Sequence, residues 1–154
     1  MSILDKITLR SFAIVAILFL TVQQVQAQQE HKSMLQYIID NQPDLGELAV
    51  KAGLAPTLSG NTAYTFLMPS DADINNLKKE PAQRLRTILS GHILKGRYLE
   101  SDFKDGATLE TLAGTSITVC RKKDHTLLSG ARVIEANTEV KNGIVHKLSS
   151  SIKL

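Results

Sequence analysis

The spacing of hydrophobic residues along the chain changes at Gly91. Before Gly91, apolar residues recur about every 3.6 positions, which is typical of amphipathic helices. After Gly91 they alternate with polar residues over short stretches, which is typical of half-buried strands. One apolar run, Tyr64 to Met68, interrupts the helical part and is expected to form a buried strand that Pro69 ends. Helices followed by strands, without strand–helix–strand alternation, predict the α+β class.

Capping residues indicate where the helices begin and end. Asp44 is expected to cap a helix with one apolar face, and Gly53 should end that helix in a left-handed conformation. Ser70, with Asp73 three residues later, matches a capping box, so another helix should begin directly after it. The segments expected to be helical are 34–39, 45–52, 54–58, 71–77 and 81–90.

Turn residues divide the part after Gly91 into short strands. Gly114 lies between two alternating stretches, as in a hairpin, and Asn142-Gly143 is the strongest turn dipeptide in the chain. The last strand is expected to carry Ile144, Val145, Leu148 and Ile152. The other expected strands are 92–94, 108–112, 116–120, 126–128 and 132–134.

The chain begins with the pattern of a secretory signal peptide. Lys6 and Arg10 give a positive start, Phe12 to Val22 is a short apolar core, and Val25-Gln26-Ala27 fits a cleavage site. This apolar run is shorter than the roughly 20 residues needed to span a bilayer, which favours a cleaved signal peptide. The alternative is an uncleaved signal anchor. Cleavage near Ala27 predicts a secreted protein, extracellular or periplasmic, whose mature chain is soluble and has no membrane span.

The size and charge of the mature chain limit what it can be. Cleavage leaves 127 of the 154 residues, enough for one domain with its own core, preceded by a short polar tail at 28–33. Without Lys6, Arg10 and Asp5, the 18 basic and 15 acidic residues become 16 and 14, a net charge of +2. This charge is too small and too dispersed to indicate a nucleic-acid partner.

Cys120 is the only cysteine, so the chain forms no internal disulfide. Its neighbours alternate like a strand, which favours a buried structural thiol, with a reactive or intermolecular thiol as the alternative. Cys120 is also the only covalent route to a dimer.

Two blocks of sequence, in this order, carry a family resemblance. The first is the strand Tyr64 to Met68 followed by Pro69, Ser70 and Asp71, and the second is the turn and strand Asn142 to His146. Together with the segment 85–96 between them, these blocks resemble the signatures of a fasciclin domain, an extracellular adhesion module. The resemblance covers residues 34–154. The signature positions, interpreted as structural, are Tyr64, Pro69, Ser70, Asp71, Asn142, Gly143 and His146.

The resemblance implies a fold and a binding region. The implied fold is a compact α+β wedge in which amino-terminal helices pack on two small, mostly antiparallel sheets. Fasciclin domains have been linked to cell attachment through a Tyr-His pair, which places the candidate binding surface at His92, Ile93, Leu94 and Tyr98. In this chain Gly91 stands where the tyrosine is usual, so the alternative is that His92 only supports the junction between helix and strand.

Catalysis and metal binding have little support in the sequence. His92, His125 and His146 occur with several aspartates, but no pair has a recognised ligand spacing and no nucleophile elbow or phosphate loop is present. We therefore expect no enzyme activity, no cofactor, no catalytic residue and no metal site. Ser70 and Asp71 are expected to satisfy backbone N–H groups at a helix start.

The sequence thus predicts a secreted, non-catalytic fasciclin-domain protein that acts in cell adhesion or in surface and matrix interaction. Its partner would be a protein or a glycan at a cell surface or in a matrix. The alternative is an extracellular protein that binds a small ligand or carbohydrate in a groove near His92 and Tyr98.

Overall fold

A computed structural model of the protein describes residues 32–153. The predicted signal peptide and cleavage site, and the tail before residue 32, lie outside the described residues. The helices are α2 (Met34–Asn41), α3 (Pro43–Lys51), α4 (Ala55–Ser59), α5 (Asp71–Leu77) and α6 (Ala82–Ser90), with a 3₁₀ turn η1 at Glu100–Asp102. The strands are β1 (Tyr64–Met68), β2 (Ile93–Lys95), β3 (Thr108–Glu110), β4 (Ser116–Arg121), β5 (Thr126–Leu128), β6 (Ala131–Val140) and β7 (Gly143–Leu148).

The helix boundaries largely follow the capping residues. Ser70 caps α5 by accepting a hydrogen bond from the backbone of Asp73 at 3.3 Å, and Gly53 has φ +71° after α3, as predicted. The prediction that Asp44 caps α3 is wrong, because the helix begins at Pro43 and Asp44 lies in its first turn. Proline is common at the first position of a helix because its fixed φ suits that position and the N–H it lacks is not needed there.

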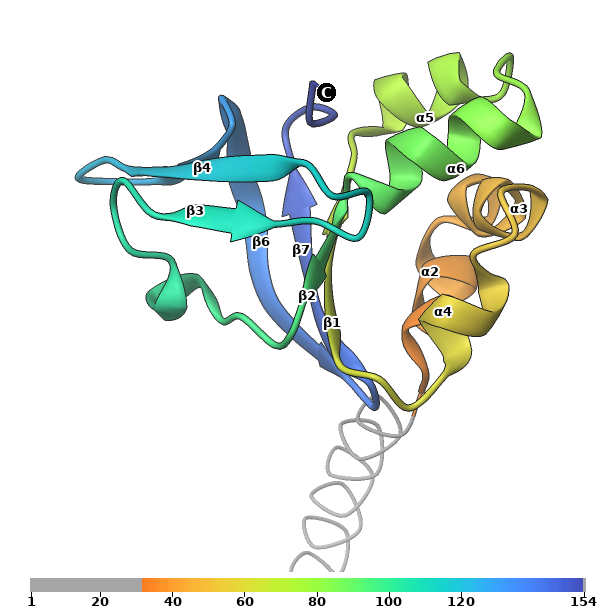
Figure 1. Ribbon diagram of the computed structural model, residues 1–154, viewed down its shortest axis with the longest axis horizontal. Helices are drawn as coiled ribbons and strands as arrows, with labels where there is room; N and C mark the ends of the chain where they lie inside the picture. The colour runs from red at the N-terminus through yellow and green to blue at the C-terminus, as the bar shows by residue number, and fades with distance from the viewer. Residues whose placement is uncertain (1–31, 154) are drawn as a thin grey trace, which may run out of the picture. The chain divides into compact units, whose positions relative to one another are not determined.

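The strands form one continuous set of hydrogen-bonded neighbours. Their order is β2-β1-β7-β6-β5-β4-β3, and every pair is antiparallel except β1 with β7. The α+β class is confirmed, but the two separate sheets that were expected are joined into one, because β6 pairs with β7 over most of its length and with β5 at its start. In Figure 1 helices α2 to α6 lie together on one side of β1 and β7, while β3 and β4 lie on the other.

The expected strand at 132–134 is much longer in the structure. β6 spans ten residues and shifts its register against β7 twice, once between Val133 and Glu135 and once between Glu135 and Thr138. A bulge breaks the alternation of side chains between the two faces of the sheet, so the polar residues of β6 do not follow a period of two along the chain. The alternation rule therefore detects only the start of β6.

Two hydrophobic clusters lie on opposite faces of the central strands. Phe66, Met68 and Val145 pack against the helices, whereas Leu67 and Leu148 pack with residues of β4, β5 and β6. This explains why β1 is a continuous apolar run, since both of its faces are buried.

Asn142 joins three elements at the hairpin between β6 and β7. Its side-chain oxygen accepts from the backbone N–H of Met34 at 2.7 Å, and its amide donates to the carbonyl of Leu58 at 2.9 Å. Its own carbonyl accepts from the N–H of Tyr64 at 3.2 Å. The loop residues of this hairpin are Lys141 and Asn142, and Gly143 is the first residue of β7. Asn142 is therefore more than a turn residue, because it ties α2, α4 and β1 to β7.

Replacing Asn142 with alanine is expected to lower the free energy of unfolding by about 2 kcal/mol. The variant leaves a buried donor on Met34 and an acceptor on Leu58 without their partner. Urea denaturation measures the change. Asn76→Ala, at an exposed position of α5, is the matched control and should stay within about 0.5 kcal/mol of the parent. Equal stability of the two variants would contradict the role of Asn142.

Candidate functional site

The predicted binding residues lie at the junction of α6, β2 and the segment that follows β2. The side chains of His92, Ile93 and Leu94 are fully buried, so they present no surface to a partner in this structure. Tyr98 is half-buried, and its neighbour Arg97 is exposed. The binding surface at this segment stays a prediction. Of its predicted residues only Tyr98 is accessible, and the exposed side chains beside it are Lys95 and Arg97.

His92 links the end of α6 to residues near the carboxyl end of the described chain. Its Nδ1 lies 3.0 Å from the carbonyl of Ile88, and its Nε2 lies 2.9 Å from the backbone N–H of Ile152. Since a carbonyl needs a donor and an N–H needs an acceptor, the ring is neutral with its proton on Nδ1. Burial lowers the pKa of His92, outweighing the Ile88 carbonyl and the Asp73 carboxylate, which favour the charged ring. These contacts fit the buttress interpretation of His92.

Asp73 holds the same carboxyl-terminal segment at a second point. One of its carboxylate oxygens accepts from the hydroxyl of Ser70 at 2.5 Å and from the backbone N–H of Ser151 at 2.8 Å. Asp73 thus completes the start of α5 and also fixes the chain just before Ile152.

The buried side chain of His146 binds the backbone of the predicted binding segment. Its Nε2 lies 2.7 Å from the carbonyl of Tyr98, and its Nδ1 accepts from the backbone N–H of Asn137 at 3.1 Å. The imidazole is therefore neutral with its proton on Nε2, the opposite tautomer to that of His92. Burial lowers the pKa of His146 and outweighs the Tyr98 carbonyl and the Glu100 carboxylate, which favour the charged ring. The ring of Phe103 packs on His146 with 5.3 Å between centroids.

Thr65 completes the support of this segment. Its hydroxyl accepts from the backbone N–H of Tyr98 at 2.9 Å and donates to the carbonyl of Gly96 at 2.8 Å. Both backbone polar groups of Tyr98 are thus bonded by buried side chains, from Thr65 of β1 and His146 of β7. The sequence analysis did not assign Thr65 this role, although a hydroxyl within an apolar strand was the available signal.

The remaining signature residues make contacts within the fold. Tyr64 begins β1 opposite Gly143, Pro69 is buried after the strand, and Ser70 caps α5 as expected. Asp71 differs from the prediction, because its carboxylate accepts from the side chain of Gln42 at 2.9 Å and so ties α5 to the junction of α2 and α3.

Reactive groups in the described part of the chain are dispersed. Within residues 32–153 no three His, Cys, Asp or Glu side chains come close enough together to hold a metal ion. Cys120 is a half-buried free thiol on β4, and His125 is half-buried between β4 and β5. None of the helices in this range has the length and apolarity needed to cross a membrane.

The architecture defines a class of protein. Helices cover one face of a bent, mostly antiparallel sheet, and the two signature strands lie next to each other as its only parallel pair in the described residues. This is the α+β arrangement of a fasciclin-like domain. The family model described as "Fasciclin domain" matches residues 43–153, and the chain belongs to this family.

Individual relatives agree with the family. The chain is 33% identical over 104 residues to transforming growth factor-beta-induced protein ig-h3 of Sus scrofa, and 25% identical over 133 residues to periostin of Homo sapiens. These matches cover 62% and 86% of this chain but only 15% and 16% of those proteins. A solved domain pair of the insect cell adhesion molecule fasciclin I has the same fold, with a TM-score of 0.66, 15% identity, and coverage of 81% of this chain and 52% of that one.

Proposed function

We propose that the protein is a secreted, non-catalytic adhesion domain that binds a protein or glycan at a cell surface or in a matrix. The fasciclin family and the likeness to a cell adhesion molecule support this role. The proposed binding face is centred on Arg97 and Tyr98. Secretion rests on the signal-peptide pattern before Ala27.

One observation carries the choice of this face. The segment around Tyr98 has no regular secondary structure, yet buried groups hold its backbone at three points, namely the carbonyl of Gly96 and the N–H and carbonyl of Tyr98. A segment fixed before binding loses little conformational entropy when a partner docks. Tyrosine and arginine are also the residue types that most often dominate binding energy.

Arg97 on the proposed binding face forms an exposed ion pair with Glu139. The guanidinium of Arg97 lies 3.2 Å from the carboxylate of Glu139, and both side chains are largely exposed. Such a pair stabilises the fold by little, about 0–1 kcal/mol, so Arg97 can exchange Glu139 for a partner at low cost.

A cell-attachment assay on surfaces coated with the purified protein tests this proposal. The variant Arg97→Ser combined with Tyr98→Phe should reduce attachment about tenfold or more, because it removes two contact groups. The aromatic ring that packs near Phe103 is retained, so the melting temperature should change by only about 2 °C.

The matched control is Arg84→Ser, which removes an exposed arginine of α6 from its ion pair with Glu80. This control should attach cells as the parent does. Full attachment by the Arg97 and Tyr98 variant, or an equal loss in both variants, would reject the proposed face.

A further inference from the structure

A small cleft lies between α2 and the β6–β7 hairpin, on the helix side of the sheet. Its volume is about 130 Å³, and Met68 and Val145 form the apolar part of its lining. Tyr37 and Asn41 line it from α2, and Gln42 follows directly after that helix. This cleft is separate from the Arg97 and Tyr98 face, and the inference drawn from it does not depend on the proposed adhesive function.

The two bulges of β6 create the polar side of the cleft. Val133 belongs to the cluster on the far face of the sheet, so regular alternation would place residue 135 on that face as well. The first register shift instead pairs Glu135 with Lys147, and the second pairs Thr138 with Val145. Lys147 and Val145 are two residues apart and share a face, so the bulges bring Glu135 and Thr138 to the same side. Bulges that redirect side chains in this way are common beside functional sites.

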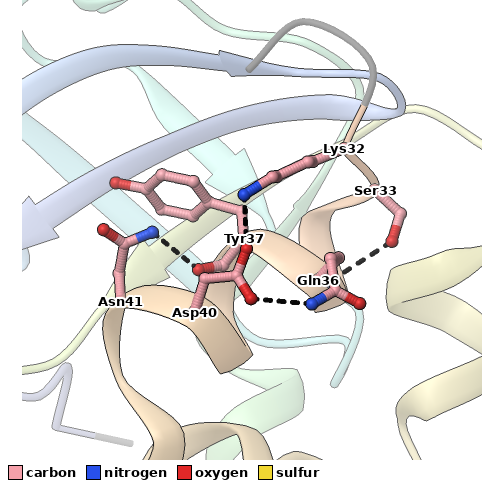
Figure 2. Close-up of polar contacts among 6 residues, drawn as sticks. All are labelled: Lys32, Ser33, Gln36, Tyr37, Asp40 and Asn41. Atoms are coloured by element: carbon pink, nitrogen blue, oxygen red, sulfur yellow. Dashed lines mark hydrogen bonds and ion pairs between the residues drawn. The ribbon is translucent and has the colours of Figure 1, made fainter. Parts of the chain in front are cut away.

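The α2 side of the cleft offers an aromatic ring and polar atoms. Figure 2 shows the ring of Tyr37 and the carboxamide of Asn41 projecting to the same side of the helix, one turn apart. The amide of Asn41 donates to the carbonyl of Tyr37 at 2.8 Å, which leaves its side-chain oxygen able to accept. The neighbouring Asp40 is already paired with Lys32 and Gln36, and these hydrogen bonds lower the pKa of its carboxyl group. Tyr37 and Asn41 are therefore the α2 side chains with hydrogen-bonding capacity for a ligand.

The charges in the cleft are balanced but loosely paired. The ammonium of Lys147 lies 3.9 Å from the carboxylate of Glu135, too far for a hydrogen bond. The Lys147 side chain is only 27% exposed, and within residues 32–153 no hydrogen-bond acceptor contacts its ammonium. A bound anion would meet the Glu135 carboxylate, and a bound cation would meet Lys147. A neutral ligand rich in hydroxyl groups can accept from Lys147, donate to Glu135 and Asn41, and avoid both conflicts.

The size of the cleft limits the ligand further. A volume of about 130 Å³ lies below the roughly 300–1,000 Å³ of pockets for drug-sized molecules. The occupant is therefore a single ring rather than an extended molecule. The face of Tyr37 and the apolar side chains of Met68 and Val145 suit the C–H faces of such a ring, and the polar atoms around them suit its hydroxyl groups.

We propose that the cleft between α2 and the β6–β7 hairpin binds one neutral sugar ring, as a monosaccharide or as one unit of a glycan. Tyr37 packs against the ring, and Lys147, Glu135, Thr138 and Asn41 bind its hydroxyl groups. A ligand of about twelve non-hydrogen atoms in such a small cleft is expected to bind with a Kd of roughly millimolar. Several rings presented together would bind more tightly.

The test is nuclear magnetic resonance with the purified protein and three neutral probes, the methyl glycosides of glucose, galactose and mannose. At least one glycoside should receive saturation from the protein and shift the amide signals of Thr138, Val145 and Lys147, with a Kd in the millimolar range. Lys147→Met and Thr138→Val should each weaken this binding about fivefold or more, with melting temperatures close to that of the parent. Lys78→Met, which removes an exposed lysine from its ion pair with Asp44, is the matched control and should bind as the parent does.

Three outcomes would overturn the proposal. The first is the absence of binding by all three glycosides at tens of millimolar. The second is binding that both cleft variants leave unchanged. The third is tighter binding of acetate or methyl glucuronide, which would mean that Lys147 recognises an anion. Because Arg97 and Tyr98 are unchanged in these variants, cell attachment through the other face is scored separately and can fail or succeed independently.

Discussion

Replacing Gly143 with alanine is expected to destabilise the protein by about 4 kcal/mol or more, which is a large part of the 5–15 kcal/mol that stabilises an ordinary domain. A Cβ atom at this position would lie 1.9 Å from the carbonyl oxygen of Tyr64 and 2.8 Å from the terminal methyl of Met34. The methyl group can move, but the backbone of Tyr64 is held in β1 between β2 and β7. The strands must therefore separate at the start of their parallel pairing.

Circular dichroism during urea denaturation measures this effect, and the expected result is a lower midpoint or the loss of a cooperative transition. Gly114→Ala is the matched control. Gly114 has φ +81° but open space around its Cα, so alanine there should cost only about 1 kcal/mol from backbone strain. If both variants lose the same stability, close strand packing is not what requires glycine at position 143.

Acidification below pH 6.5 is expected to destabilise the protein steeply, because His92 and His146 are both neutral and buried. Each ring uses one nitrogen to accept a backbone hydrogen bond, so protonation breaks the bond from Ile152 or from Asn137. Burial holds both pKa values below the ordinary histidine value of about 6.5. The unfolded chain therefore binds more protons than the folded protein once the pH falls below about 6.5.

The sign of the effect follows from this difference in bound protons. Stability is complete above the unfolded pKa and is lost as the pH falls toward the lower folded pKa. One proton per histidine gives a slope of about 1.4 kcal/mol per pH unit, so the two together approach about 2.7 kcal/mol per pH unit.

Urea denaturation at pH 7.5, 6.5, 5.5 and 5.0 measures this slope. His92→Gln and His146→Gln should each reduce it to about half. A parent protein equally stable at pH 7.5 and 5.0 would show that the two imidazoles are not held neutral by the fold.

The sequence predicts those parts of the fold in which a local pattern matches the final environment. β1 is found at Tyr64 to Met68 because burial on both faces leaves a continuous apolar run. The start of α5 is found because the Ser70 cap is a local interaction. The same holds for β5, whose three residues lie between clear turns.

The sequence fails where a residue is required by a distant part of the chain. Asn142 was correctly placed in a turn, but Gly143 begins β7 rather than completing that turn. The asparagine serves α2 and α4, and the glycine admits the backbone of Tyr64. β6 was underestimated because two bulges interrupt its alternation. The polar side of the cleft was missed for the same reason, since Glu135 and Thr138 face the same way only after both register shifts.

The expected role of His92 shows a different limit. Its position next to an apolar strand predicted a residue near the core, and the structure buries it completely. A contact with Ile152, sixty residues away, cannot be inferred from spacing.

The parallel pairing of β1 with β7 determines when the fold can be completed during synthesis. β7 lies inside the sheet between β1 and β6, yet it comes nearly eighty residues after β1 in the chain, with Tyr64 opposite Gly143. Until the ribosome has made residues 143–152, β1 lacks one neighbour, and the partners of Asp73 and His92 do not yet exist. Contacts between such distant segments slow folding. The domain therefore cannot complete its sheet until β7 has been made, and until then the edge of β1 that pairs with β7 stays unpaired.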